Sequence, residues 1–326
     1  MADLTLVEAV NRALHHELAH DPSVVVLGED VGVDGGVFRA TAGLLEAFGP
    51  GRVLDTPLAE TLIGGMAVGM AAMGMKPVAE IQFSGFIYSV MDHVVNHAAR
   101  LRTRTRGRLT CPMVLRSPCG AGIHAPEHHS ESVEALFAHV PGLRVVIPSS
   151  PQRAYGLLLA AIRDPDPVIF LEPTRLYRLF KQPVEDNGEA LPLDVCFVLR
   201  EGSDVTVVSW GAALHDALAA ADALAEDGIS VEVIDVATLK PLDAGTIVAS
   251  VAKTGRCVIV HEAARTGGFG GEIAAVVAEH ALTSLLAPVR RVTGWDCVVP
   301  LAKLEHAYLP DAGRIAAAVR GVLEYA

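Results

Sequence analysis

A single glutamate stands where a strand-like segment gives way to a glycine-rich helical one. The segment RVLDTPLAE (52–60) ends on Glu60, and the following residues, ETLIGGMAVGMAAMG, predict a helix that contains four glycines. A carboxylate at the carboxyl edge of an open α/β sheet is well placed to bind a ligand or to move a proton. Each glycine inside a helix costs up to about 1 kcal/mol relative to alanine, so a close neighbour is expected to compensate. Taken alone, Glu60 also fits an ordinary carboxylate stabilised by the helix dipole.

A histidine-rich loop supplies a second group of candidate residues. The segment GAGIHAPEHHSES contains His124, His128 and His129. Histidine titrates near neutral pH, which suits proton transfer. Pro126 disfavours a continuous helix that would hold His124 and His128 on one face, and no cysteine or aspartate spacing completes a zinc site. The residues alone leave open a proton-transfer role and an ordinary hydrogen-bonded loop histidine.

Two further histidines and a run of arginines follow one another in the sequence. His93 and His97 have metal-ligand spacing, but no third ligand is evident, so we interpret them as surface or interface residues. Arginines occupy alternate positions from Arg100 to Arg108, a spacing that scatters side chains around a helix. The chain has 26 Lys plus Arg, 38 Asp plus Glu and a net charge of -12. We therefore expect it to bind neither nucleic acid nor a membrane.

Alternating strand and helix patterns surround these candidates. Thr5 and Glu8 form a capping box at the start of a helical pattern, and further helical segments lie near 60–75, 86–104 and 151–163. Between them lie the strand-like runs VVVLG (24–28), RVLDT, PVAEI, PMVLR, RVVIP and PVIFL. Apolar strands interleaved with helices predict an α/β fold with a largely parallel sheet covered on both faces.

The periodicity lapses between about residues 173 and 203. This stretch is polar and contains prolines, so we interpret it as a surface connector. We divide the chain into domains of residues 1–185 and 186–326. Beyond the connector, strand-like and helical runs alternate again and predict a second, smaller α/β domain. A composition of 51% hydrophobic and 20% charged residues agrees with packed domains and excludes disorder.

The sequence favours a cytoplasmic location. Acidic residues stand near the amino terminus where a signal peptide carries positive charge. The longest apolar run, residues 62–75, is shorter than the roughly 20 residues that cross a bilayer. The five cysteines include no C-x-x-C pair, which argues against a disulfide framework and for a reducing compartment.

Several motifs, in order along nearly the whole chain, resemble those of one family. They are DTPLAE with Glu60, EIQFSGF with Phe86, GAGIHAPEHHSES, FAHVPGLRVVIPSSP and AAIRDPDPVIFLEPTRLYR. Together they resemble the β subunit of the thiamine-diphosphate-dependent 2-oxo acid dehydrogenases, the decarboxylating components of the pyruvate and branched-chain 2-oxo acid dehydrogenase complexes. VEVIDVATLKPLD and VIVHEAARTGGFGGEIA resemble the carboxyl-terminal domain of transketolase-like enzymes. The resemblance implies a transketolase-like pyrimidine-binding domain followed by that second domain.

The resemblance implies roles for four residues. Glu60 matches the carboxylate that hydrogen-bonds the pyrimidine nitrogen of thiamine diphosphate and so promotes loss of the thiazolium proton. Phe86 matches the aromatic residue that packs on the pyrimidine, and Leu58 lines the same pocket. His129 matches a proton donor in acyl transfer to the lipoyl group. The implied enzyme is an oxidoreductase that decarboxylates a 2-oxo acid and reductively acylates a lipoyl domain.

Half of the implied cofactor site is missing from this sequence. Related thiamine enzymes hold the diphosphate and a magnesium ion through a GDG sequence and a later Asn-Asn pair, and neither occurs here. The resemblance therefore implies an α subunit that carries the magnesium within an α2β2 heterotetramer, and a chain that is inactive alone. The second domain is expected to form the β–β contact and to dock the dihydrolipoyl acyltransferase core.

The resemblance also implies a potassium site made by main-chain oxygens. The matching positions are Met113, Ala161, Ile162, Asp164 and Asp166. Hard oxygen ligands suit such an ion. Asp166 replaces an amide found in relatives, a change that a main-chain contact tolerates.

Two alternatives stay open at this point. An acetoin dehydrogenase β subunit shares the cofactor half-site and differs in its substrate. A noncatalytic assembly scaffold shares only the fold, and the retained Glu60 and His129 argue against it. The choice among pyruvate, branched-chain 2-oxo acids and acetoin depends on a pocket shared with the α subunit.

Overall fold

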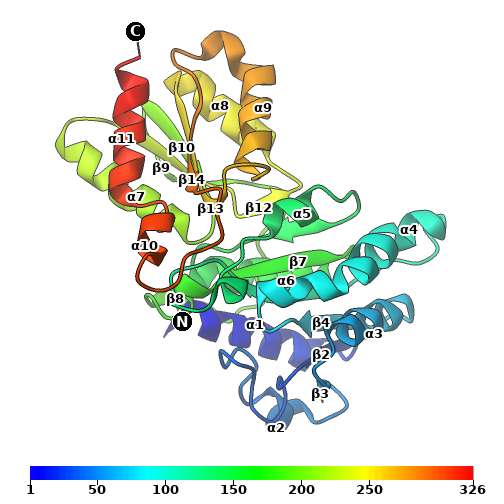
Figure 1. Ribbon diagram of the computed structural model, residues 1–326. Helices are drawn as coiled ribbons and strands as arrows, with labels where there is room; N and C mark the ends of the chain where they lie inside the picture. Colours follow the sequence, from blue (N-terminus) through cyan, green and yellow to red (C-terminus); the bar gives the residue numbers. More distant parts are fainter. Residues whose placement is uncertain (326) are drawn as a thin grey trace. The chain divides into compact units, whose positions relative to one another are not determined.

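The computed structural model describes residues 1–325, which form two compact units (Figure 1). The first unit comprises residues 1–119 and 136–193, and the second comprises residues 120–135 and those from 194 onward. The loop 120–135 therefore groups with the second unit, although the sequence places it between strands of the first. The predicted division was a single cut after residue 185, whereas the two units interleave along the chain.

A parallel sheet forms the centre of the first unit. Six strands of this unit lie in the order β6, β7, β5, β4, β2, β3, and neighbours among them run parallel. Their bounds are β2 (Val24–Gly28), β3 (Val53–Asp55), β4 (Lys76–Glu80), β5 (Val114–Cys119), β6 (Arg144–Val146) and β7 (Val168–Pro173). Each corresponds to a strand-like run of the sequence. Strands β2, β5 and β7 are buried along their whole length, as expected when helices cover both faces of a parallel sheet.

Two helices of the first unit, α1 (Leu6–His20) and α6 (Pro151–Arg163), begin at the predicted caps and pack side by side. The unit also contains α2 (Leu44–Phe48) and α3 (Glu60–Ala72). Thr5 and Glu8 form the predicted capping box, in which the Thr5 N–H donates to Glu8 Oε2 at 2.7 Å. Ser150 Oγ accepts from the Arg153 N–H at 3.3 Å and caps α6.

The segment predicted as one helix over 86–104 is irregular. It consists of a 3-10 helix η1 (Ser84–Val90), a π-helix η2 (Asp92–His97), a short η3 (Ala98–Arg100) and α4 (Leu101–Arg104). Val90 of η1 packs closely on α3, because a Cβ added to Gly64 would lie 3.1 Å from Val90 Cβ. This close approach explains one of the glycines of α3.

The second unit also contains a mostly parallel sheet. Its strand order is β14, β13, β10, β11, β9, with only the edge strand β9 antiparallel. The strands are β9 (Phe197–Arg200), β10 (Val205–Ser209), β11 (Val231–Asp235), β13 (Cys257–Ala264) and β14 (Arg290–Gly294). The helices are α7 (Ala213–Glu226), α8 (Ala244–Thr254), α9 (Gly270–Ala281), α10 (Glu305–Tyr308) and α11 (Ala312–Leu323).

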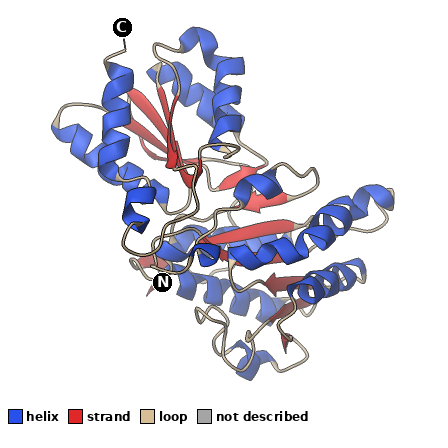
Figure 2. Ribbon diagram, viewed as in Figure 1, coloured by secondary structure: helices blue, strands red, loops and turns tan. Residues whose placement is uncertain are grey.

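Strand β10 lies between helices on both faces of this sheet (Figure 2). Val205 and Val207 join an apolar core that includes residues of α7 and α11. Thr206 points to the opposite face, as alternate strand residues do. Its hydroxyl lies 2.7 Å from Ser250 Oγ and 2.8 Å from Thr254 Oγ1 of α8. The predicted α/β architecture of this unit is therefore present.

The predicted connector over 173–203 contains regular structure. β8 (Gln182–Val184) pairs antiparallel with β1 (Ala2–Leu4), and β9 lies at the edge of the second sheet. These strands are three or four residues long and partly exposed, so their sequences lack a continuous apolar run.

The other short elements are η4 (Glu127–His129), α5 (Glu134–Ala138), η5 (Thr174–Leu176), β12 (Thr238–Lys240) and η6 (Leu282–Ser284). Within residues 1–325, no helix combines the length and apolar character needed to span a membrane.

Candidate active site

Glu60 is the first residue of α3. It follows β3 at the carboxyl edge of the sheet, and no side chain caps the helix at Ala59. A half-buried carboxylate at this position is stabilised by the positive end of the helix dipole. Thr61 Oγ1 donates to the carbonyl of Ser89 at 2.9 Å, which joins the start of α3 to η1, the element that carries Phe86.

A second carboxylate, Glu29, interacts with Glu60. Glu29 follows β2 directly, at the same edge of the sheet. Burial raises the pKa of Glu29, and the negative charges of Asp30 and Glu60 raise it further. The raised pKa favours the protonated form of Glu29. Glu29 was absent from the sequence-predicted residues, although its place just after a buried strand was a usable signal.

The loop that follows Glu29 is attached to the end of β3. Asp55 accepts hydrogen bonds from two backbone groups of this loop, the Gly32 N–H at 2.5 Å and the Val33 N–H at 3.1 Å. Side-chain acceptors of this kind replace the regular hydrogen bonds that a loop lacks. Asp55 thereby fixes the path of the loop that begins directly after Glu29.

Leu58 stands two residues before Glu60, and Phe86 lies on η1, which packs against α3. The Leu58 side chain is 73% exposed, and Phe86 is half-buried. The ring of Phe86 meets Phe83 edge to face, with centroids 6.1 Å apart, and Phe83 meets Phe38 in the same way at 5.5 Å. These contacts hold the Phe86 ring in place while part of it stays exposed, a combination that suits packing against a flat heterocycle.

A buried charge network crosses the neighbouring strands β4, β5 and β7. Arg116 donates to Glu80 Oε2 at 2.7 Å and to both oxygens of Glu172, and Tyr177 Oη donates to Glu172 Oε2 at 2.7 Å. Burial raises the pKa of Glu80 against the opposing effect of Arg116. Burial also raises the pKa of Tyr177, and the charge of Glu172 adds to this. The network links side chains of three adjacent strands through one guanidinium.

His129 lies in the second unit, on η4 within the loop 120–135. Burial lowers its pKa, and the neighbouring His128 lowers it further, which favours a neutral ring at physiological pH. The two imidazole centroids are 4.1 Å apart.

The carboxylate of Glu305 anchors the same loop. It accepts from the Gly122 N–H at 2.7 Å and the His124 N–H at 3.0 Å, and His124 Nδ1 lies 2.7 Å from Glu305 Oε2. His124, His128 and His129 belong to no three-ligand metal cluster within the described chain.

The five residues of the expected potassium site lie in the first unit. Ala161 and Ile162 occupy the last turn of α6, where helix carbonyls lack intrahelical partners, and Met113 precedes β5. The side chain of Asp164 pairs with Arg144, and that of Asp166 pairs with Arg102. Both carboxylates are therefore used in ion pairs.

Comparison with known proteins identifies the family. Residues 2–179 match the family described as "Transketolase, pyrimidine binding domain", and residues 196–315 match "Transketolase, C-terminal domain". The chain is 50% identical to the pyruvate dehydrogenase E1 component subunit beta of Bacillus subtilis, with 100% of each chain covered. It is 51% identical to the protein of the same name from Acholeplasma laidlawii, with 98% of each covered. The chain belongs to this family of E1 β subunits.

A solved structure supports the fold. The chain described as "Split gene transketolase, inactive beta4 tetramer" matches with a TM-score of 0.79 at 24% identity, and 99% of each chain is covered. The predicted transketolase-like α/β fold and the predicted family are confirmed by these matches. The roles of the individual site residues stay predictions.

Proposed function

We propose that this chain is the β subunit of the decarboxylating component of a 2-oxo acid dehydrogenase complex. The proposal rests on one observation above all: a half-buried carboxylate, Glu60, opens α3 at the carboxyl edge of a parallel sheet, in a chain whose full-length relatives are named pyruvate dehydrogenase E1 component subunit beta. The names of these relatives favour pyruvate as the substrate, over branched-chain 2-oxo acids and acetoin.

The residues around Glu60 fit the aminopyrimidine half of thiamine diphosphate. A carboxylate, an exposed leucine and a partly exposed phenylalanine ring match the hydrogen-bonding edge and the apolar faces of such a heterocycle. When bound, this cofactor supplies the electron sink on which a 2-oxo acid loses carbon dioxide. In our proposal Glu60 holds a proton at the pyrimidine nitrogen, Phe86 packs on the ring, and Leu58 shields one side from water.

The remaining half of the site belongs to a partner in this proposal. The sequence lacks GDG and Asn-Asn, so an α subunit holds the diphosphate and magnesium in an α2β2 heterotetramer. The acyl acceptor is the lipoyl domain of a dihydrolipoyl acyltransferase, whose core docks on the second domain. His129 donates a proton during acyl transfer in this proposal. Because its pKa is lowered, the ring first takes up that proton and then passes it on.

Two further features complete the proposal. A potassium ion held by main-chain oxygens around Met113, Ala161, Ile162, Asp164 and Asp166 braces the end of α6 against β5. The location is the cytoplasm, supported by five cysteines that are all free within the described residues, as a reducing compartment favours.

The experiment tests Glu60 in the assembled enzyme. The chain is copurified with its α subunit and assayed for lipoyl-dependent oxidation of pyruvate, branched-chain 2-oxo acids and acetoin. We expect pyruvate turnover, which Glu60→Gln lowers by at least about 100-fold because an acid–base group is lost. Glu46→Gln is the matched control, since Glu46 is an exposed glutamate in the first turn of α2. Full activity of the Glu60→Gln enzyme contradicts the proposed role, and turnover of acetoin alone contradicts the proposed substrate.

A further inference from the structure

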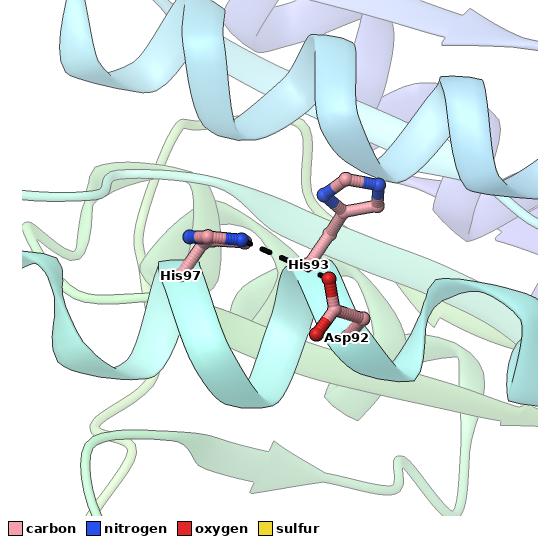
Figure 3. A group of neighbouring side chains, drawn as sticks. All are labelled: Asp92, His93 and His97. Atoms are coloured by element: carbon pink, nitrogen blue, oxygen red, sulfur yellow. Dashed lines mark ion pairs between the residues drawn. The ribbon is translucent and has the colours of Figure 1, made fainter.

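Three side chains outside the proposed cofactor site come together on η2. Asp92, His93 and His97 each offer one ligand atom, and these atoms all lie within 4.8 Å of one another (Figure 3). The two histidines have metal-ligand spacing in the sequence but lack a third ligand there. The fold supplies that ligand from Asp92.

The π-helical winding of η2 explains why Asp92 joins the histidines. In an α-helix the neighbours on one face are three and four residues apart, whereas a π-helix makes its hydrogen bonds over five residues. Asp92 and His97 are five residues apart, and Asp92 Oδ2 lies 3.8 Å from His97 Nε2. His93 and His97 have ring centroids 5.8 Å apart.

Neighbouring groups orient two of the three ligands. The Asn96 amide donates to Asp92 Oδ1 at 2.7 Å, which leaves Oδ2 directed at His97. A Cβ added to Gly65 of α3 would lie 3.3 Å from His93 Cε1, so this glycine makes room for the imidazole ring. Figure 3 shows His93 reaching toward the neighbouring helix. The close approach of His93 therefore explains Gly65, a second glycine of α3.

We propose that Asp92, His93 and His97 bind one Zn²⁺ ion, with water as the fourth ligand. Two imidazoles, one carboxylate and a water form a tetrahedral set that zinc favours, at roughly 2.0–2.2 Å from each protein ligand. Tetrahedral geometry at that radius separates the ligand atoms by roughly 3.3 Å. The side chains of Asp92 and His97 are 67% and 47% exposed, so they can rotate to close this distance and an ion can reach them.

Arg104 opposes the metal-bound state. Its Nη1 lies 3.4 Å from His97 Nδ1, and a guanidinium can only donate, so Nδ1 accepts and Nε2 carries the proton. Zinc at Nε2 moves that proton to Nδ1, where Arg104 cannot accept it. Removing the cation should therefore strengthen zinc binding, and Arg104→Gln also provides an oxygen that can accept from Nδ1.

The test measures metal binding to the untagged full-length chain. After treatment with a chelator, Zn²⁺ is titrated by calorimetry, and Co²⁺ is added separately to follow visible absorption from imidazole ligation. We expect one Zn²⁺ per chain, binding weakened by about 10–100-fold or more in His97→Ala and in Asp92→Asn, and binding strengthened in Arg104→Gln. The His97→Ala and Asp92→Asn variants should still fold, because both altered side chains are exposed.

The chain contains its own matched control. His16 and His20 in α1 are also four residues apart, but His20 Nδ1 lies 2.7 Å from the His16 carbonyl and the two rings stack at 4.2 Å. We expect His20→Ala to leave zinc affinity unchanged. The proposal is overturned if the chain binds no Zn²⁺, if His97→Ala or Asp92→Asn binds it as tightly as the original chain, or if His20→Ala is as damaging. Weaker binding by Arg104→Gln would overturn the assigned ligand atom.

Discussion

Arg116 donates to both carboxylate oxygens of Glu172, from Nε at 2.6 Å and from Nη2 at 2.8 Å. The third contact of the guanidinium is Glu80, and all three side chains are nearly inaccessible to water. Two carboxylates and one cation thus share a buried site. Removing one member of such a network is strongly destabilising, because the remaining buried charge has neither water nor an opposite charge to stabilise it.

We expect Arg116→Gln to lower the free energy of unfolding by about 3–5 kcal/mol, since it leaves Glu80 and Glu172 without their cation. Urea denaturation of the purified chain measures this change. Arg200→Gln is the control, because the Arg200–Asp222 ion pair lies at the surface and contributes little. Equal stability of the two variants would contradict a structural role for the buried network.

The glycines of α3 should respond differently to alanine. A Cβ at Gly69 meets nothing within 4 Å, so Gly69→Ala should raise the free energy of unfolding by up to about 1 kcal/mol through helix propensity. Gly64→Ala should gain less or destabilise, because its Cβ would lie 3.1 Å from Val90 Cβ. Thermal unfolding of both variants is the measurement. Equal gains would show that η1 does not constrain α3.

His261 in β13 gives the chain an acid-sensitive core. It stacks on Trp210 with centroids 5.2 Å apart, and burial together with the charge of Arg291 lowers its pKa to about 4. The unfolded chain takes up a proton near pH 6.5, whereas the folded chain resists until about pH 4. A depressed histidine pKa therefore contributes stability that is present above pH 6.5 and is lost as the pH falls to about 4.

Replacing His261 should make the free energy of unfolding less dependent on pH in the acid range. We expect His261→Phe to show a smaller loss of stability between pH 6.5 and 4 than the original chain, because the titrating group is gone. Denaturant unfolding at a series of pH values measures the slope. His280→Gln, at an exposed histidine of α9, serves as the control. An unchanged slope in His261→Phe would assign the acid sensitivity to other groups.

The titration of Glu29 should depend on the charge of Glu60. Glu60→Gln removes one negative charge that raises the pKa of Glu29, so that pKa should fall toward its ordinary value while burial and Asp30 keep it above. Carbon NMR of side-chain-labelled glutamate follows the titration, and a Glu29→Gln spectrum assigns the signal. Glu46→Gln should not move it. No change in Glu60→Gln would mean that the two groups do not interact.

Local signals in the sequence predict much of the fold. Thr5 with Glu8 and Ser150 with Pro151 specify where α1 and α6 begin, because capping depends on neighbouring residues alone. The apolar runs locate the central strands for a similar reason. The short strands β8 and β9 depend on partners far away in the chain, so local patterns miss them.

The candidate sites were predictable in part. Glu60 stands out because a strand end and a helix start meet there. The pairing of Glu29 with Glu60 requires two separate strand ends to converge, and the joining of Asp92 to His97 requires π-helical winding. Residue spacing shows neither relationship. The first depends on how distant strands are arranged, and the second depends on a local departure from α-helical winding.

The loop 120–135 is anchored by Glu305, a residue that is synthesised much later than the loop itself. The Gly122 N–H and Glu305 Oε1 are 183 residues apart in sequence. During translation the strands of the first sheet and this loop are all made well before Glu305, the residue that anchors the loop. A polypeptide truncated before α10 would contain every strand of both sheets, yet it would lack the carboxylate that accepts from the Gly122 and His124 N–H groups.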